Sequence, residues 1–320
     1  MSAVAWAQLV YLKDIPVKIN SEFSIIKKYL SGIGTSYLKS NGIDLSVGDD
    51  CAILAANSKL LISTDTSVAD VHFLKAMPSD AIAYRAVAVA LSDIAAMGGE
   101  PVAFNLSLVM PNFTPDWMKG FRKGLQKISR EFKCPLIGGD LVKGPLQVSV
   151  TVIGKPKKEI LVRSGANAGD ILCLSGELGR GYIGYREFKS SSVLNKITKP
   201  YLFPTPQINF GLAISSIASS SIDISDGIIQ DLSHLISSSG VGCSIDLDKV
   251  PVADKKLKKQ CLEFGDDYQI LFTVAPRQLA MLQTRLKSIG KKCHTIGVMG
   301  GKELIVNNHI DSLKNWDHFK

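Results

Sequence analysis

The chain has 320 residues, is 46% apolar and 21% charged, and has a net charge of +8 that divides evenly between its two halves. This composition excludes wholesale disorder, and the length suits two domains of about 150 residues each. Of its 29 acidic residues, 21 are Asp and only 8 are Glu. Because Asp is a short ligand for hard cations in turns, this excess prompts a search for metal sites.

Several function classes are disfavoured by pattern. The six cysteines form no C-x-x-C pair and the five histidines form no H-E-x-x-H pair, so we expect reduced, buried cysteines in a cytoplasmic protein without zinc. The basic runs at 155–163 and 249–259 are interpreted as solvated surface and not as a nucleic-acid site. Arg85 and Asp93 interrupt the longest apolar stretch, 81–97, which therefore predicts a buried helix and not a membrane span.

Strands and helices are predicted along the chain without a strict βαβ rhythm, so the pattern alone does not separate α+β from α/β. Residues 1–20 are expected to form a loosely attached extension and not a signal peptide. A Gly-, Pro- and Lys-rich segment at 154–158 predicts a boundary between domains at 21–154 and 159–320. The predicted elements are helix 21–30, strand 60–63, helix 78–97, strand 102–110, helix 114–132, strand 146–153, strand 170–175, helix 179–189, helix 208–218, strand 221–224, helix 228–238, strand 243–247, strand 268–274, helix 276–289 and short strands near 295 and 304.

Two nucleotide-binding patterns bear on the function of the chain. The chain contains no G-x-x-x-x-G-K-[ST], which excludes a P-loop kinase. Residues 179–184 match G-x-G-x-x-G, but a dinucleotide site also requires an acidic residue about 20 positions later. After Glu187 the next acidic residue is Asp223. We therefore expect an ordinary glycine-rich loop at the start of a helix.

Aspartate recurs in short polar turns beside apolar strands. Residues at the ends of neighbouring strands can meet at one edge of a sheet, where carboxylates suit Mg²⁺ bound to phosphate. Each turn taken alone is equally an ordinary turn or helix cap. Asp93 lies in an otherwise apolar helix, so it is either a metal ligand or satisfied by Arg85 or by a backbone cap. The segments are 47–52, 61–66, 91–95, 136–140, 222–227 and 264–268.

Two further residues are single candidates. A lone histidine such as His72 is more often a packing or surface residue than a catalytic one. Trp316 lies in an aromatic segment close to the C-terminus, which is either a docking plug for the tail or a flat ring for a heteroaromatic ligand.

The polar segments occur in a specific order. They read Gly-Asp-Asp-Cys-Ala at 48–52, Ser-Thr-Asp-Thr at 63–66, Leu-Ser-Asp-Ile-Ala-Ala-Met-Gly at 91–98, Ile-Gly-Gly-Asp at 137–140, Arg-Ser-Gly-Ala at 163–166, Ile-Asp-Ile-Ser-Asp-Gly at 222–227 and Trp-Asp-His-Phe at 316–319. In this order they resemble the thiamine-monophosphate kinase family over roughly residues 21–320. The resemblance implies an α+β fold shared with aminoimidazole ribonucleotide synthetase and selenophosphate synthetase. It also implies an N-terminal domain that binds ATP and Mg²⁺ and forms a homodimer through its sheet, and a C-terminal domain that closes over it.

The resemblance implies transfer of the γ-phosphate of ATP to thiamine monophosphate, assisted by several Mg²⁺ ions. It assigns the metal ligands to Asp50, Ser63, Thr64, Asp65, Asp93, Asp140, Asp223 and Asp226. It assigns ATP contacts to Gly139, Arg163 and Ser225, and thiamine monophosphate contacts to His72, Asp266 and Trp316. There are two departures: Asp266 stands where the family usually has Glu, and Lys143 stands where it usually has Arg, which loses a bidentate contact.

The chemistry implied by the resemblance requires no general base. A phosphate monoester has a second pKa of about 6 and is mostly a dianion near pH 7, so it is already a nucleophile. Cations are required to bring two polyanions together, and we expect direct in-line transfer without a phosphoenzyme. The rivals are another ATP-dependent enzyme of the same superfamily and a non-enzymatic binder of divalent ions or nucleic acid. The latter is disfavoured because the chain lacks an EF-hand spacing and a basic face.

Overall fold

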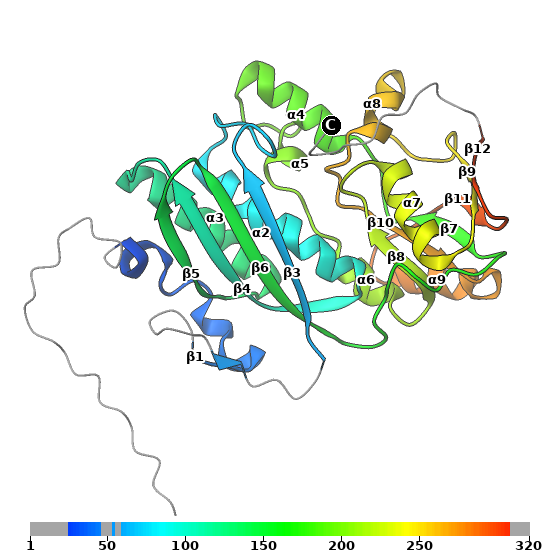
Figure 1. Cartoon of the computed structure of the whole chain (residues 1–320), viewed down its shortest axis with the longest axis horizontal. Helices are drawn as coiled ribbons and strands as arrows, with labels where there is room; N and C mark the ends of the chain where they lie inside the picture. The colour runs from blue at the N-terminus through cyan, green and yellow to red at the C-terminus, as the bar shows by residue number, and fades with distance from the viewer. Residues whose placement is uncertain (1–24, 46–52, 55–58, 308–320) are drawn as a thin grey trace, which may run out of the picture.

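The computed structural model describes residues 25–45, 53–54 and 59–307 and places them mainly in two sheets with helices packed on them (Figure 1). A four-stranded sheet belongs to the first half of the chain and a six-stranded sheet to the second. Each sheet combines antiparallel pairs with one parallel pair. The predicted α+β class is thereby confirmed.

The four-stranded sheet has the order β3-β6-β4-β5 and contains polar segments that were expected to be turns. Ser63 to Thr66 lie within β3, where alternate residues face the core and the hydroxyl of Thr64 bonds to Thr151 Oγ1 at 2.9 Å across the strand pair. The segment at 138–140 likewise continues β5 beside β4. Pairing with neighbouring strands therefore overrides the turn propensity of Gly, Ser and Asp. The bounds are β3 (Leu61–Val68), β4 (Gly99–Met110), β5 (Leu136–Lys143) and β6 (Gln147–Pro156).

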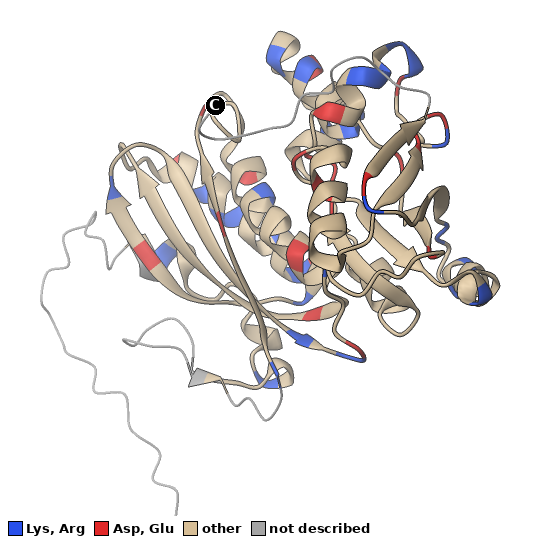
Figure 2. Ribbon diagram, turned by 45° about the vertical axis from the view of Figure 1, so that its right-hand side comes forward, with Lys and Arg blue, Asp and Glu red and all other residues tan. Residues whose placement is uncertain are grey.

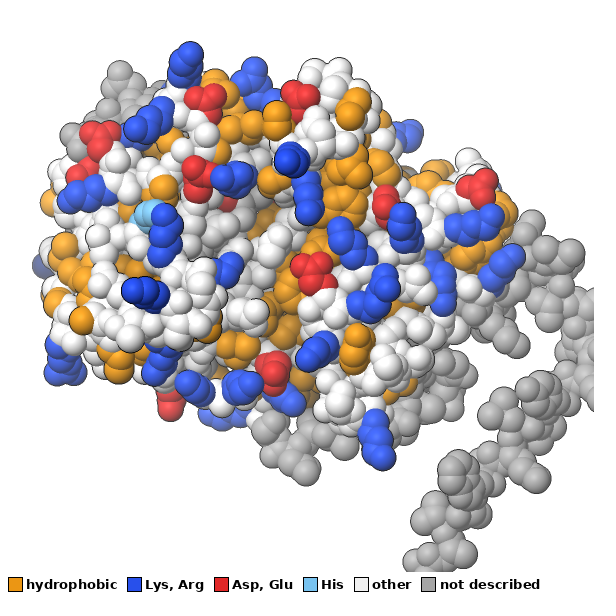
Figure 3. Space-filling view, turned by 180° about the vertical axis from the view of Figure 1, so that it is seen from behind, with side chains coloured by type: hydrophobic (Ala, Val, Ile, Leu, Met, Phe, Trp, Pro, Cys, Tyr) orange, Lys and Arg blue, Asp and Glu red, His pale blue; other side chains and the backbone are white. Residues whose placement is uncertain are grey.

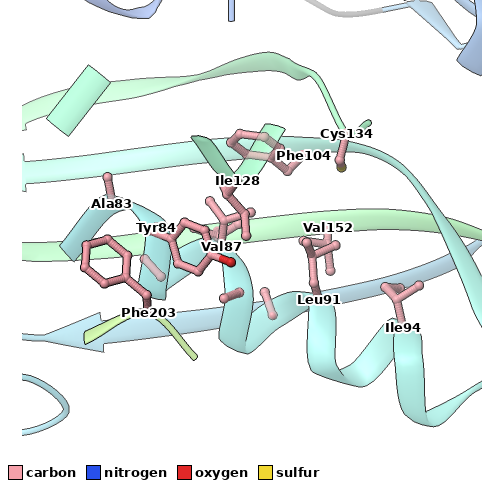
Figure 4. Close-up of a cluster of buried hydrophobic side chains, with 14 of the residues drawn as sticks. Ala83, Tyr84, Val87, Leu91, Ile94, Phe104, Ile128, Cys134, Val152 and Phe203 are labelled. Atoms are coloured by element: carbon pink, nitrogen blue, oxygen red, sulfur yellow. The ribbon is translucent and has the colours of Figure 1, made fainter. Parts of the chain in front are cut away.

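Helix α2 (Ser79–Ala96) is buried on nearly all sides, as its apolar sequence predicts. The sheet and α3 (Pro115–Phe132) cover one side of it, and elements of the second half of the chain cover the other. Figure 4 shows side chains of α2 directed toward Phe104, Ile128 and Val152 of this core. A polar group in the middle of such a helix must find a partner or a ligand inside the molecule.

The six-stranded sheet has the order β12-β9-β11-β7-β10-β8 and helices on both faces. Leu271 points to the face covered by α7, whereas its neighbours Ile270 and Phe272 point to the face covered by α6 and α9. Burial on both faces explains the continuous apolar runs of these strands. The bounds are β7 (Ile171–Leu174), β8 (Ala218–Asp223), β9 (Cys243–Asp246), β10 (Ile270–Val274), β11 (His294–Met299), β12 (Leu304–Asn307), α6 (Ile208–Ile214), α7 (Ile228–Ser239) and α9 (Leu279–Ser288).

Smaller elements complete the described part of the chain. The helix predicted to reach residue 218 ends at Ile214, and two short helices within polar segments were not predicted. Helix α4 follows the glycine-rich loop, as expected. These elements are α4 (Arg180–Ser191), α5 (Lys199–Leu202), α8 (Lys258–Glu263), β1 (Ile43–Leu45), β2 (Ile53–Leu54), the π-helix η1 (Ile26–Leu30), and the 3₁₀ turns η2 (Thr35–Tyr37), η3 (Lys39–Asn41), η4 (Lys255–Leu257) and η5 (Pro276–Gln278).

The two halves pack directly against each other. A Cβ atom at Gly211 of α6 would lie 1.9 Å from the carbonyl oxygen of Ala95 in α2, so only glycine permits this contact. Just after β6, the Leu161 N–H donates to the Met97 carbonyl at 3.1 Å. One apolar core runs from α2 to Phe272 of the six-stranded sheet. Side chains of both halves therefore lie next to each other where the halves meet.

Charge is distributed over the whole molecule. Figure 2 shows Lys and Arg on both halves of the ribbon, and Figure 3 shows them scattered over one face among acidic and neutral side chains. This arrangement is that of a solvated surface, as the even division of the net charge predicts. No helix in the described ranges is both long and apolar enough to cross a membrane.

Candidate active site

A cavity of about 570 Å³ is lined by side chains from both halves of the molecule. Strand β3, the segment that follows it and helix α2 line it from the first half. The turn after β8, the turn before β10 and helices α4 and α5 contribute from the second half. Four aspartates line one part of this cavity, and aromatic rings line another.

The acidic part combines Asp65 of β3, Asp93 of α2, Asp223 at the end of β8 and Asp226 of the next turn. Burial, followed by the charges of Asp93 and Asp226, raises the pKa of Asp65 to about 6. Burial and then the Asp93 charge raise the pKa of Asp223 to about 7. The cavity therefore holds negative charge that is incompletely neutralised by protein groups.

Two hydroxyls and one cation partly compensate this charge. Ser63 Oγ donates to Asp93 Oδ2, and Ser92 Oγ donates to Asp223 Oδ2 at 2.7 Å. Burial raises the pKa of Asp93, while the Ser63 hydrogen bond and the Arg163 guanidinium oppose that rise. The Arg163 guanidinium also opposes the rise in the pKa of Asp223. An arginine near two carboxylates is suitably placed to meet an anionic ligand that binds there.

The two turns that carry Ser225 and Asp266 interlock backbone to backbone. Strands β8 and β10 are antiparallel neighbours, with Asp223 opposite Ile270. In the turns that adjoin them, the Asp266 N–H donates to the Ser225 carbonyl at 2.9 Å. A Cβ at Gly265 would lie 2.0 Å from that carbonyl oxygen, so glycine is required there. The fit of the two turns fixes where Ser225 and Asp266 lie.

A buried carboxylate from α7 holds the first of these turns. Asp231 Oδ2 accepts the N–H groups of Ser225 at 3.1 Å and Asp226 at 3.2 Å. Burial, followed by the charge of Asp223, raises the pKa of Asp231 to about 8. Asp231 thus orients the segment that presents Asp226 to the cavity.

The glycine-rich loop at 179–184 is occupied from inside the protein. Asp267 accepts the N–H of Gly179 at 2.6 Å and that of Gly181 at 3.1 Å, at the start of α4. A carboxylate at a helix N-terminus occupies the position in which a bound phosphate would otherwise be favoured. The expectation of an ordinary loop at a helix start, and not of a dinucleotide site, agrees with this arrangement.

The aromatic part is formed by Tyr185 of α4, Tyr201 of α5, Phe264 and Tyr268. The rings of Tyr185 and Phe264 stack with centroids 5.3 Å apart, and those of Tyr185 and Tyr201 meet edge to face at 5.5 Å. Such faces suit a flat or cationic ring. His72 also lines the cavity, and its Nδ1 accepts the Val68 N–H at 3.0 Å.

Asp266 lies beside these rings and is paired with Arg85 of α2. Arg85 and the Tyr268 hydroxyl, at 2.7 Å, both donate to Asp266 Oδ1. The pairing of Arg85 with Asp93, one of the alternatives left open by the sequence, is therefore wrong. Asp93 is satisfied by Ser63 and faces the cavity instead.

Other assigned residues lie away from this cavity in the single chain. Asp140 and Gly139 are on β5, and two strands separate them from Asp65 on β3. Thr64 is on β3, but its side chain points to the outer face of the sheet, opposite to Asp65. Asp140 shares that outer face, since it pairs in register with the outward Ser107. Asp50 and Trp316 lie outside the described residues.

The acidic part suits hard cations. Within the described ranges, no three His, Cys, Asp or Glu side chains converge closely enough to form a ligand cluster by themselves. Mg²⁺ is typically held by one or two carboxylates together with substrate phosphates, so separated carboxylates around one cavity are compatible with it. Uncompensated charge at Asp65 and Asp223 is what such a cation would neutralise. The donor set therefore fits.

The sequence did not predict the roles of three residues that build the site. Arg85 and Asp231 are isolated charges in apolar helices, and this isolation was a usable signal for a buried partner. Asp267 was included among the turn residues, but its role in clamping the glycine-rich loop depends on a contact 86 to 88 positions away in sequence. Local pattern carries no information about such a contact.

Comparison with known proteins defines the class first. A family model described as "AIR synthase related protein, N-terminal domain" matches residues 48–155, and its C-terminal counterpart matches residues 167–307. The chain is thus a two-domain protein of the AIR synthase related type. Structures of the hydrogenase maturation protein HypE are similar to this chain in fold only. That of Escherichia coli, for example, has 18% identity and a TM-score of 0.70.

Closer relatives specify the family. A thiamine-monophosphate kinase of Buchnera aphidicola subsp. Schizaphis graminum is 35% identical over 305 residues, which cover 90% of this chain and 93% of the relative. The enzyme of Escherichia coli K12 is 35% identical, with 87% and 90% covered. The crystal structure of thiamine-monophosphate kinase from Stenotrophomonas maltophilia K279a superposes with a TM-score of 0.80 at 31% identity, covering 90% and 97%. The chain belongs to the thiamine-monophosphate kinase family.

One further neighbour was solved with ligands. A structure described as AaThiL complexed with AMPPCP and TMP has a TM-score of 0.73 and 27% identity, and covers 96% of this chain and 100% of that one. That protein therefore binds an ATP analogue and TMP on the same two-domain fold.

Proposed function

We propose that this chain transfers the γ-phosphate of ATP to thiamine monophosphate, giving thiamine diphosphate and ADP. The main support for the proposal is that four aspartates and a group of aromatic rings line the same cavity. Its aromatic part suits the rings of thiamine, one of which is cationic, and its acidic part suits phosphates bound with cations. Membership of the family and the ligands of AaThiL support the same substrates.

The proposed chemistry relies on position and charge. The phosphate of the acceptor is largely a dianion near pH 7, so the residues of the cavity need not remove a proton from it. Mg²⁺ would be held by Asp65, Asp93, Asp223 and Asp226, with Ser63 orienting Asp93 and with Asp50, Thr64 and Asp140 as the further assigned ligands. When bound, it would screen the repulsion between the phosphates and stabilise charge on the departing ADP.

The remaining assignments divide between the two substrates. Arg163, Ser225 and Gly139 are proposed to contact ATP. The proximity of Arg163 to Asp93 and Asp223 supports its part of this assignment. His72, Asp266 and Trp316 are proposed to contact thiamine monophosphate. Both His72 and Asp266 line the cavity beside the aromatic rings.

We further propose a cytoplasmic homodimer that associates through the outer face of the four-stranded sheet. Thr64 and Asp140, two assigned metal ligands, share that face and point away from the cavity of their own chain. Sedimentation at micromolar concentration should give twice the mass of 34.6 kDa. A monomer at that concentration that retains full activity would contradict the proposal.

The activity is tested by coupled detection of ADP with ATP, Mg²⁺ and a panel of acceptors. We expect ADP release with thiamine monophosphate and none with thiamine, which lacks the attacking phosphate. Turnover with a different phosphate acceptor, but not with thiamine monophosphate, would move the chain to another branch of the superfamily.

A further inference from the structure

Arg85 and Asp266 form a buried ion pair between the two halves of the molecule. Their side chains are only 5% and 11% exposed. Asp266 Oδ1 accepts hydrogen bonds from Arg85 and from the Tyr268 hydroxyl. Asp266 Oδ2 is buried, and among the described residues it has no hydrogen-bond partner. A buried carboxylate oxygen without a donor is unfavourable unless a ligand supplies one.

Arg85 also holds the surroundings of this carboxylate. Its Nη1 donates to the Tyr201 carbonyl at 2.7 Å, and its Nη2 donates to the His72 carbonyl at 3.4 Å. The guanidinium carbon lies 4.8 Å from the centre of the Tyr201 ring. One side chain therefore connects the segment after β3, helix α5 and the turn before β10, and residues of all three line the cavity.

The turn itself requires such a restraint. Asp266 and Tyr268 have φ angles of 61° and 52°, in the left-handed region that non-glycine residues rarely adopt. Conformations of this kind persist when surrounding contacts fix them. The planar guanidinium can donate in several fixed directions at once, which a lysine ammonium cannot reproduce.

We infer that Arg85 is a positioning residue that fixes Asp266 Oδ1, so that Asp266 Oδ2 serves as the acceptor for an amino group on the heteroaromatic ring of the substrate. This inference rests on the proposed function and adds a specificity element to it. Since thiamine has an exocyclic amino group on its pyrimidine ring, the pair selects thiamine monophosphate over an analogue that presents oxygen at that position. Arg85 acts through Asp266 and takes no part in the phosphate transfer.

The test compares steady-state kinetics with thiamine monophosphate and with oxythiamine monophosphate, which carries oxygen in place of the amino group. In Asp266→Asn, Arg85 and Tyr268 still donate to the amide oxygen, so the NH₂ group replaces Oδ2 and presents a donor. We expect the ratio of kcat/KM for the two substrates to fall by about tenfold or more in this variant. Arg85→Met should raise the KM for thiamine monophosphate about tenfold while kcat changes less than about threefold.

Two variants separate positioning from folding. Arg122→Met removes an arginine that binds the backbone carbonyls of Tyr29 and Ser31 at 2.9 and 2.8 Å, away from the cavity, and it should leave the KM unchanged. Arg85→Lys keeps the charge, and its KM should lie between that of the wild type and the value expected for Arg85→Met. It takes the place of Arg85→Met in the test if that variant does not fold. If the wild-type protein is active and both Arg85→Lys and Asp266→Asn leave the KM and the substrate ratio unchanged, the inference is overturned but the proposed function is not. Wild-type protein without turnover of thiamine monophosphate would overturn the proposed function as well.

Discussion

At the scale of single residues, the identity of a side chain predicted the kind of environment it occupies better than it predicted which residue it pairs with. Asp93 was expected to be a metal ligand or satisfied by a partner, because a carboxylate in an apolar helix is costly unless it is satisfied. The structure places it at the cavity, bonded to Ser63. Arg85, eight residues earlier on the same helix, pairs instead with Asp266, which is 181 positions away. Helical spacing could not predict that choice, since it depends on which segment packs over α2.

Replacement of Asp93 by Asn tests its proposed metal role. The change keeps the volume and the Ser63 contact but removes the charge, so kcat should fall at least about 100-fold, equivalent to about 2.7 kcal/mol of transition-state stabilisation. Turnover at saturating Mg²⁺ is the measurement. Asp116→Asn is the matched control, since Asp116 is a surface residue whose side chain is 93% exposed. Near-wild-type turnover of Asp93→Asn would remove it from the metal site.

At the scale of elements, long apolar segments were predicted well, whereas the polar segments of the site were predicted only in part. The apolar runs that became α2 and β6 were recognised within a few residues. Polar segments at 63–66 and 138–140 were expected to be turns, yet both continue strands because each residue there has a paired neighbour. The interlocked turns before α7 and β10 were located from their Gly and Asp content. Their contact with each other follows only from the pairing of β8 with β10.

Gly265→Ala tests the interlocking of these turns. Gly265 has a φ of 69° and no room for a Cβ beside the Ser225 carbonyl. Gly290 has a φ of 67° but nothing within 4 Å of a Cβ, so Gly290→Ala measures the backbone cost alone. We expect urea unfolding to show a loss of about 1 kcal/mol for Gly290→Ala and of about 3 kcal/mol or more for Gly265→Ala. Equal losses would show that the two turns are not rigidly held together.

At the scale of the whole molecule, the site exists because two sheets bring separated carboxylates together. Asp65 comes from the four-stranded sheet and Asp223 from the six-stranded sheet, and both line one cavity. The excess of Asp over Glu indicated that such a site was present. It did not indicate that Asp140 would lie on the opposite edge strand, because strand order is not encoded in local pattern.

The crowding of carboxylates predicts an unusual dependence of stability on pH. The pKa values of Asp65, Asp223, Asp231 and Asp267 are raised to between about 6 and about 8, mainly by burial. The unfolded chain loses these protons near pH 4, whereas the folded chain keeps them to higher pH. Without divalent cations, the free energy of unfolding should therefore fall as the pH rises from about 5 to about 8.

Urea unfolding in EDTA at several pH values measures this slope. Asp223→Asn should make the total fall in the free energy of unfolding between pH 5 and pH 8 smaller by on the order of 2 kcal/mol, since it removes one of the buried titrating groups. Addition of Mg²⁺ should stabilise the protein more at pH 8 than at pH 5, because the carboxylates that would hold it are then ionised. A stability that rises steadily from pH 5 to pH 8 in EDTA would contradict the raised pKa values.

The fate of the γ-phosphate of ATP shows whether it is transferred directly to thiamine monophosphate. The protein is incubated with Mg²⁺, thiamine monophosphate and ATP labelled in its γ-phosphate, and the labelled products are separated. We expect the label in thiamine diphosphate, none bound to the protein after denaturation, and its near-complete loss from the product with Asp93→Asn. Label that appears only in inorganic phosphate, or that remains covalently on the protein, would contradict direct transfer to thiamine monophosphate in this cavity.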